Sequence, residues 1–273
     1  MSVEYPEIRL AAPVAIIVPS GALPVKSVTA RGLLARLAQA PGQLVAYHQL
    51  TESIWEEREP RSAKSNLRTA AASLRRALGS GERDPAEVLR TYRASPGQAN
   101  GAMSLDLPES AIDLFQVTRK VDAAFEHIRA DRLSECRRLC RELESVDLTG
   151  FGTDLPATRW FGVLAQRVQR LWLRMNLVRC KTALLDGDFV VAERIAVTLH
   201  RSQAAIDPGE ALLTVTQFFL GDTAQSLEHL TALRDRHSAL GLDWPPHFDR
   251  LQHAILNHSH AEVREIARVD LVL

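Results

Sequence analysis

The sequence predicts a mainly α-helical protein with an N-terminal winged helix-turn-helix of α+β type over residues 1–107. An all-α domain of tetratricopeptide-like helical repeats is expected over residues 108–273. In the first part, short β-branched runs accompany three helix-like stretches. Between Arg93 and Pro108, residues that break regular structure are concentrated. Beyond Pro108 nearly every segment is helix-like.

Bulk composition narrows the function classes. The chain of 273 residues can hold two cores, and its formal net charge of +0 means that any nucleic-acid surface is a local patch. Three cysteines, an odd number, favour a reducing compartment over a disulfide framework. The sequence shows no signal peptide and no stretch of about 20 apolar residues that could span a bilayer. We therefore expect a cytoplasmic protein without membrane contact.

The first part reads as a small sheet, three helices and a hairpin. The runs Ile8–Val18 and Leu23–Val28 predict the N-terminal sheet. Thr29 is expected to cap the first helix, which Pro41 and Gly42 end. The remaining elements are a helix over Tyr47–Glu57, a helix over Ser62–Leu78 and a hairpin of Val88–Tyr92 with Gly101–Leu105. This order is typical of a winged helix.

The second part contains a repeat. Gly187-Asp188 recurs as Gly221-Asp222, 34 residues later, which is the period of a tetratricopeptide unit. Gly allows the positive φ of a tight turn, and Asp can cap the next helix. Pro208 is expected to start the helix that leads to Gly221. An earlier helix pair turning at Ala130-Asp131 and a final helix over Pro246–Asn257 complete the predicted stack.

The helix over Ser62–Leu78 has two unlike faces. Its narrow apolar face consists of Leu67, Ala71, Leu74 and Leu78. No acidic residue lies between Pro60 and Gly79. Small or polar residues and one arginine face outward, where they could contact base edges: Ser65, Thr69, Ser73 and Arg76. Basic residues flank them, where phosphates would run: Arg61, Lys64, Arg68 and Arg75.

In the hairpin, Arg90 and Arg93 could reach an adjacent groove or its phosphates. A solvated amphipathic helix would also account for the basic face alone. The position of this helix, after two short helices and before a basic hairpin, favours double-stranded DNA as the partner.

The chain resembles the Streptomyces antibiotic regulatory proteins, the SARP family. The resemblance rests on Leu50-Thr51-Glu52-Ser53-Ile54-Trp55 and on Leu74-Arg75-Arg76-Ala77-Leu78-Gly79, which are fairly specific together. It continues through Leu105-Asp106-Leu107-Pro108 into the entry of the family's bacterial transcriptional activator domain. Ala72-Ser73 departs from the more basic or polar residues that the family usually carries there.

This resemblance implies a transcription activator that binds direct repeats near a promoter and contacts RNA polymerase. It also implies a tetratricopeptide-like second domain. The alternative is an adaptor or small-ligand sensor that works through the helical repeats with weak or no autonomous DNA binding. The sequence leaves open a homodimer.

Other residue groups carry weaker signals. Cys136 and Cys140 lie four apart and are expected to be core residues, and the histidines near residue 258 are expected at a fraying helix end rather than on a metal. No phosphate loop, Gly-x-Ser-x-Gly or His-Glu-x-x-His motif is present, so we expect neither catalysis nor a cofactor. One arginine-rich stretch with tryptophans could bind a small anionic effector or a partner: Arg159, Trp160, Arg167, Arg170, Trp172 and Arg174. The alternative for that stretch is a helix core with a solvated arginine face.

Overall fold

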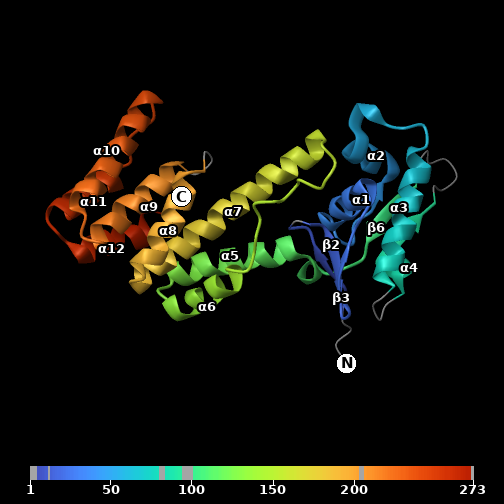
Figure 1. The fold of residues 1–273 in the computed structure, drawn as a ribbon, viewed down its shortest axis with the longest axis horizontal. Coiled ribbons are helices and arrows are strands. Elements are labelled where there is room, and N and C mark those ends of the chain that lie inside the picture. Colours follow the sequence, from blue (N-terminus) through green and yellow to red (C-terminus); the bar gives the residue numbers. More distant parts are fainter. Residues whose placement is uncertain (1–4, 12, 80–83, 94–100, 203–205, 272–273) are drawn as a thin grey trace. The chain divides into compact units, whose positions relative to one another are not determined.

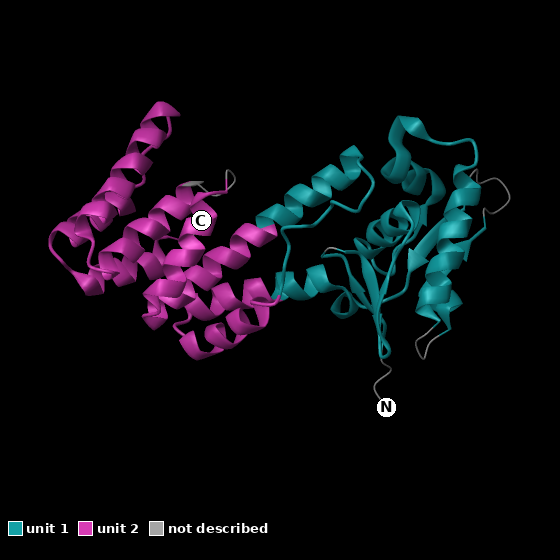
Figure 2. Cartoon of the chain, viewed as in Figure 1, with its two compact units in different colours: residues 1–119, 146–170 teal, residues 120–145, 171–273 magenta. Residues whose placement is uncertain are grey.

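The computed structural model describes residues 5–11, 13–79, 84–93, 101–202 and 206–271. The chain forms two compact units (Figure 2). The first comprises Met1–Arg119 and Val146–Arg170, and the second comprises Lys120–Ser145 and Leu171–Leu273. Two helices, α5 (Asp113–Arg129) and α7 (Arg159–Asp186), contribute residues to both units. Compact units do not define family domains, so the boundary after Leu107 stays a prediction.

The N-terminal sheet has three antiparallel strands in the order β1-β2-β3 (Figure 1). They are β1 (Glu7–Arg9), β2 (Ala15–Val18) and β3 (Gly21–Pro24). The predicted run Ile8–Val18 is therefore two strands, because the backbone N–H groups between them donate to side chains instead of a ladder. Leu10 and Ala11 donate to the Asp113 carboxylate, each at 2.9 Å, and Val14 donates to Asp154 at 3.0 Å.

Three helices follow: α1 (Val28–Ala38), α2 (Tyr47–Trp55) and α3 (Ala63–Leu78). The cap of α1 is Ser27, whose hydroxyl accepts from the Ala30 N–H, so the prediction of Thr29 as the cap is wrong. Consequently the predicted strand reaching Val28 ends at Pro24. A short 3-10 turn, η1 (Glu56–Arg58), follows α2.

The hairpin belongs to a second antiparallel sheet of order β4-β6-β5. Its strands are β4 (Val45–Ala46), β5 (Leu89–Tyr92) and β6 (Ala102–Leu105), and a short helix that the sequence did not predict, α4 (Pro85–Val88), precedes β5. Leu89 pairs with Leu105 and Tyr92 pairs with Ala102. We expect the Gly/Pro/Asn-rich connection of the hairpin at residues 94–100. These residues lie outside those that the structure describes.

The segment 146–170 packs within the first unit, against α1 and α2. Arg31 of α1 donates to the Asp154 carbonyl at 2.5 Å, and the Thr158 hydroxyl donates to the Ser53 carbonyl at 2.6 Å. Arg36 lies over the Trp160 ring, 4.9 Å from its centroid. Residues far beyond the winged helix in the sequence therefore stabilise its first two helices.

The second unit is all-helical in the residues that the structure describes (Figure 1). Both predicted turns are confirmed, because Gly187 and Gly221 have φ of +83° and +89°. Asp188 and Asp222 cap the following helices by accepting from Val191 N–H at 3.2 Å and Gln225 N–H at 2.9 Å. Beside α5 and α7, its helices are α6 (Leu133–Leu143), α8 (Phe189–His200), α9 (Ile206–Phe219), α10 (Thr223–Ala239), α11 (Pro246–Leu256) and α12 (His260–Val269).

Two details of this unit differ from the sequence prediction. Pro208 is the third residue of α9 rather than its first. The last predicted helix is followed by another, α12, so His258 and His260 stand at a turn between two helices instead of a fraying end. His258 adopts a φ of +52°, and the Ser259 N–H donates back to the Ala254 carbonyl at 2.9 Å. No group of metal-ligating side chains occurs among the described residues.

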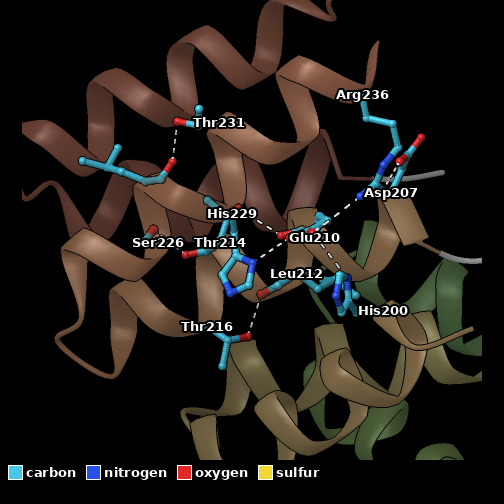
Figure 3. A network of polar contacts seen from close by, with 11 residues as sticks. His200, Asp207, Glu210, Leu212, Thr214, Thr216, Ser226, His229, Thr231 and Arg236 are labelled. Atoms are coloured by element: carbon cyan, nitrogen blue, oxygen red, sulfur yellow. Dashed lines mark hydrogen bonds and ion pairs between the residues drawn. The ribbon is translucent and has the colours of Figure 1, made fainter. Parts of the chain in front are cut away.

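A buried carboxylate links three helices of the second unit (Figure 3). The Glu210 side chain of α9 is 5% exposed. It accepts from His229 of α10 at 2.6 Å and lies 3.3 Å from His200 of α8 and 3.7 Å from Arg236. Arg236 also pairs with Asp207 at 2.8 Å. A buried charge is tolerated because several partners surround it.

The three cysteines are buried and free, which confirms that Cys136 and Cys140 are core residues. Both lie against the Thr182 hydroxyl, with sulfur–oxygen distances of 3.0 Å and 3.3 Å. Burial raises the pKa of Cys180 to about 12, so this thiol stays protonated at neutral pH. No helix in the described part of the chain is both long and apolar enough to cross a membrane.

Gly32→Val tests the packing of segment 146–170 on α1. A Cβ at Gly32 would lie 2.7 Å from Pro156 Cγ and 3.3 Å from Ile54. We expect the free energy of unfolding to fall by about 1–3 kcal/mol, as for other overpacked cores. Urea denaturation measures it.

Gly162→Ala is the matched control, because a Cβ there meets nothing within 4 Å and the residue lies inside α7. This change should leave stability equal or raise it by up to about 1 kcal/mol. Equal stability of the Gly32→Val protein and the wild type would contradict the close packing against Pro156.

Candidate nucleic-acid interface

Helix α3 separates its core face from its solvent face. Leu67, Ala71, Leu74 and Leu78 are at most 1% exposed, so the predicted core face is confirmed. The structure adds Ala63 and Ala70 to this buried face. All six side chains are apolar and anchor the helix through burial. The opposite face is thereby left free to meet a ligand.

The solvent face of α3 holds the residues that sequence reasoning assigned to bases. Ser65, Thr69, Ser73 and Arg76 are all exposed. Short side chains between the cations allow a close approach to a groove. Sequence reasoning missed Asn66, which is exposed beside Ser65 and has the amide that can pair with adenine. Its spacing of three and seven residues from Thr69 and Ser73, which places it on their face of the helix, could have indicated it.

Cations flank this face. Arg61, Lys64 and Arg68 are exposed, as is Arg76 on the face itself. None of these four forms an ion pair with a carboxylate in the described part of the chain. Some exposed arginines elsewhere are neutralised, as Arg138 is by Glu142 at 2.8 Å. Unpaired cations on a helix without acids produce a local positive surface that suits phosphates.

Arg75 differs from the other cations of α3. It is half-buried, and its Nε donates to the Leu89 carbonyl at 2.8 Å. Its terminal nitrogen donates to the Thr91 hydroxyl at 2.5 Å. The guanidinium therefore connects α3 to strand β5, and the phosphate contact of Arg75 stays a prediction. With both ends of its fork engaged, Arg75 supports the hairpin position relative to the helix.

The hairpin presents Arg90 and Arg93, both exposed. Arg90 pairs with Asp106 at 3.0 Å, and its Nε donates to the Glu87 carbonyl. A hydrogen bond with Tyr92 and the charge of Asp106 raise the pKa of Arg90. Arg93 is the last residue that the structure describes before Gly101, and it has no partner among the described residues. It is the freer of the two for a DNA contact.

The residues of the predicted arginine–tryptophan set are spread along one helix and divided between the two units, and their ligand role stays a prediction. Arg159 and Trp160 belong to the first unit, whereas Trp172 and Arg174 belong to the second. All lie on α7, where a separation of 12 residues corresponds to about 18 Å. Trp160 is covered by Arg36, and Arg174 pairs with Asp122 at 2.7 Å. Arg167 and Arg170 are exposed in the first unit.

Comparisons with known proteins bear on the same residues. Residues 26–95 match the model of a family described as transcriptional regulatory protein, C terminal. The solved structure of Mycobacterium tuberculosis EmbR in complex with a low affinity phosphopeptide is similar, with a TM-score of 0.79 and 19% identity. That likeness covers 97% of this chain and 69% of the EmbR chain, and at such identity it establishes the fold. No curated protein matches the sequence significantly.

These findings agree with the sequence prediction. The family match spans α1, α2, α3 and strand β5, so the winged helix-turn-helix is confirmed. The fold match extends through the helical part of the chain. The predicted fold class is thus confirmed, and residues 26–95 are similar to a transcriptional regulatory domain.

Arg75→Lys tests the connection between α3 and the hairpin. Lysine keeps the charge but loses the fork that reaches both Leu89 and Thr91. We expect the free energy of unfolding to fall by about 1–2 kcal/mol, because the Leu89 carbonyl loses a charged donor. Arg76→Lys, on the same helix and exposed, should leave stability unchanged. Equal losses in the two variants, measured by urea denaturation, would argue against the supporting role of Arg75.

Proposed function

We propose that this DNA-binding transcription regulator is an activator that grips promoter repeats through α3 and its hairpin. The single observation that carries the proposal is the exposed face of α3. It combines small polar side chains with cations that no described carboxylate neutralises. Such a face satisfies the two needs of a recognition helix, which are close approach to bases and attraction to phosphates.

The residues of this face divide between two roles. Arg61, Lys64 and Arg68 flank the helix and are assigned to phosphates, which supply affinity without sequence preference. Arg76, Asn66 and Thr69 are assigned to base edges, where guanine, adenine and the thymine methyl offer matching groups. Arg93 is assigned to the groove beside the hairpin.

The helical repeats are proposed to carry regulation, self-association or contact with RNA polymerase. Two copies of the chain would occupy direct promoter repeats side by side. A homodimer would be the form that binds both repeats. A small anionic effector would act through the repeats. An adaptor without autonomous DNA binding is the alternative, and the DNA experiment below separates the two.

The DNA experiment selects bound fragments from a random pool with the full chain and then titrates the winning sequence at several salt concentrations. Arg68→Ala should weaken all sequences alike and reduce the salt slope by about 0.9, the value for one lost phosphate contact. Arg76→Ala should instead relax the preference at one position of the selected sequence. Arg194→Ala, an exposed arginine of α8, is the control and should change neither.

Failure of the wild type to enrich any sequence, even at low salt, would leave the adaptor as the function. If the wild type enriches a sequence but the salt slope of Arg68→Ala is unchanged, DNA binding stands. The phosphate contact would then be assigned to other cations of α3.

Activation needs a surface that faces away from DNA. The connection between α2 and α3 exposes Glu57 and Glu59, which a phosphate backbone would repel. The double change Glu57→Ala with Glu59→Ala should therefore leave operator affinity equal and lower transcription in a purified polymerase assay. Exposed surface changes of this kind cost little stability. A transcript yield equal to that of the wild type would exclude this connection as the polymerase contact.

A further inference from the structure

The second unit contains a cavity that is lined by none of the residues assigned to DNA. It has a volume of about 860 Å³, within the range of small-ligand sites. Its aliphatic lining includes Ile128, Leu133 and Leu185. These residues belong to α5, α6 and α7, and α12 also lines the cavity. The cavity thus lies where the predicted repeat turns meet the helix that the sequence did not predict.

One wall of the cavity is aromatic. The rings of Phe189 and Phe219 stack in parallel, with centroids 4.9 Å apart and an interplanar angle of 0°. His260 lies 5.5 Å from the Phe219 ring at a tilt of 55°. Both phenylalanines are only half-buried although they are large and apolar. A partly accessible aromatic wall of this kind suits a flat ring, which could stack on it.

The charges of the cavity are unevenly compensated. Arg268 donates to both oxygens of Glu265, at 2.9 Å and 2.6 Å. The hydrogen bond with Glu265, the charge of Glu265 and the charge of Asp131 raise the pKa of Arg268. Both carboxylates of the cavity therefore act on this one arginine. Arg264 has no carboxylate partner among the described residues, and its guanidinium lies 5.8 Å from the Phe219 centroid.

We propose that this cavity binds a small organic anion with a flat ring, the ring lying against Phe189 and Phe219 and the anionic group meeting Arg264. A nucleoside monophosphate and an aromatic carboxylate share this chemistry. The Arg264 guanidinium can form paired hydrogen bonds with a phosphate or a carboxylate. Because it lies beside the aromatic wall, the ring and the anionic group of one small ligand can reach both at once. The proposal does not depend on DNA binding.

Isothermal titration calorimetry with the full chain and no DNA tests the site. The probes are AMP and 2-naphthoate, with adenosine and inorganic phosphate as molecules that each carry one half of the chemistry. At least one of the ring-bearing anions should bind, and each half alone should bind at least about tenfold more weakly. Comparison of the affinities for AMP and 2-naphthoate then shows whether the cavity prefers a nucleotide or an aromatic acid.

Variants locate the site. Arg264→Gln should weaken the bound probe by about tenfold or more, because a charge-assisted pair is lost. Phe219→Leu should also weaken it, through loss of the stacked wall. Arg234→Gln is the matched control: this arginine also lies over an aromatic ring, 4.8 Å from the Trp244 centroid, but outside the cavity. It should leave binding unchanged.

Three results would overturn the proposal: no binding of either ring-bearing anion at millimolar concentration, equal binding of AMP and adenosine, or unchanged affinity in Arg264→Gln. Because Arg264 is exposed, its replacement is expected to fold, and a melting curve checks this. A loss of DNA binding in a separate experiment would leave this result standing.

Discussion

The burial of helix α1 on two sides is the constraint on which the first unit depends. Leu33, Leu34 and Leu37 are fully buried, and α1 contacts both α2 and α3. Gly32, also buried, meets Pro156 from the segment 146–170. Helix α3 packs on α1 more extensively than on any other element, so α1 orients its outward face. Removal of either side would leave apolar surface in water.

Much of this arrangement could be predicted because it rests on local signals. The spacing of Leu67, Ala71, Leu74 and Leu78 identified the buried face of α3, and Gly187 and Gly221 identified the turns of the repeats. Helical periodicity and positive-φ turns are properties of a few neighbouring residues. A single sequence therefore contains them.

The differences come from contacts between residues distant in the chain. Asp113 and Asp154 accept backbone N–H groups from Leu10, Ala11 and Val14, and thereby separate β1 from β2. Arg75 is an arginine of α3, like the residues predicted to contact phosphates. Its hydrogen bonds to the Leu89 carbonyl and the Thr91 hydroxyl could not be predicted from that residue type. Side-chain hydrogen bonds of long sequence separation have no periodicity. The stacking of Phe189 on Phe219 is likewise a contact between residues distant in the chain.

The buried carboxylate of Glu210 has a consequence for how the helical unit moves. Its partners come from α8 and α10, and the Ser226 hydroxyl of α10 also donates to the Thr214 carbonyl of α9 at 2.6 Å. Detachment of α8 or α10 would remove partners from this buried carboxylate, which is costly. Helices α8, α9 and α10 should therefore open as one cooperative block, and their slowest amide protons should exchange with solvent at a common rate.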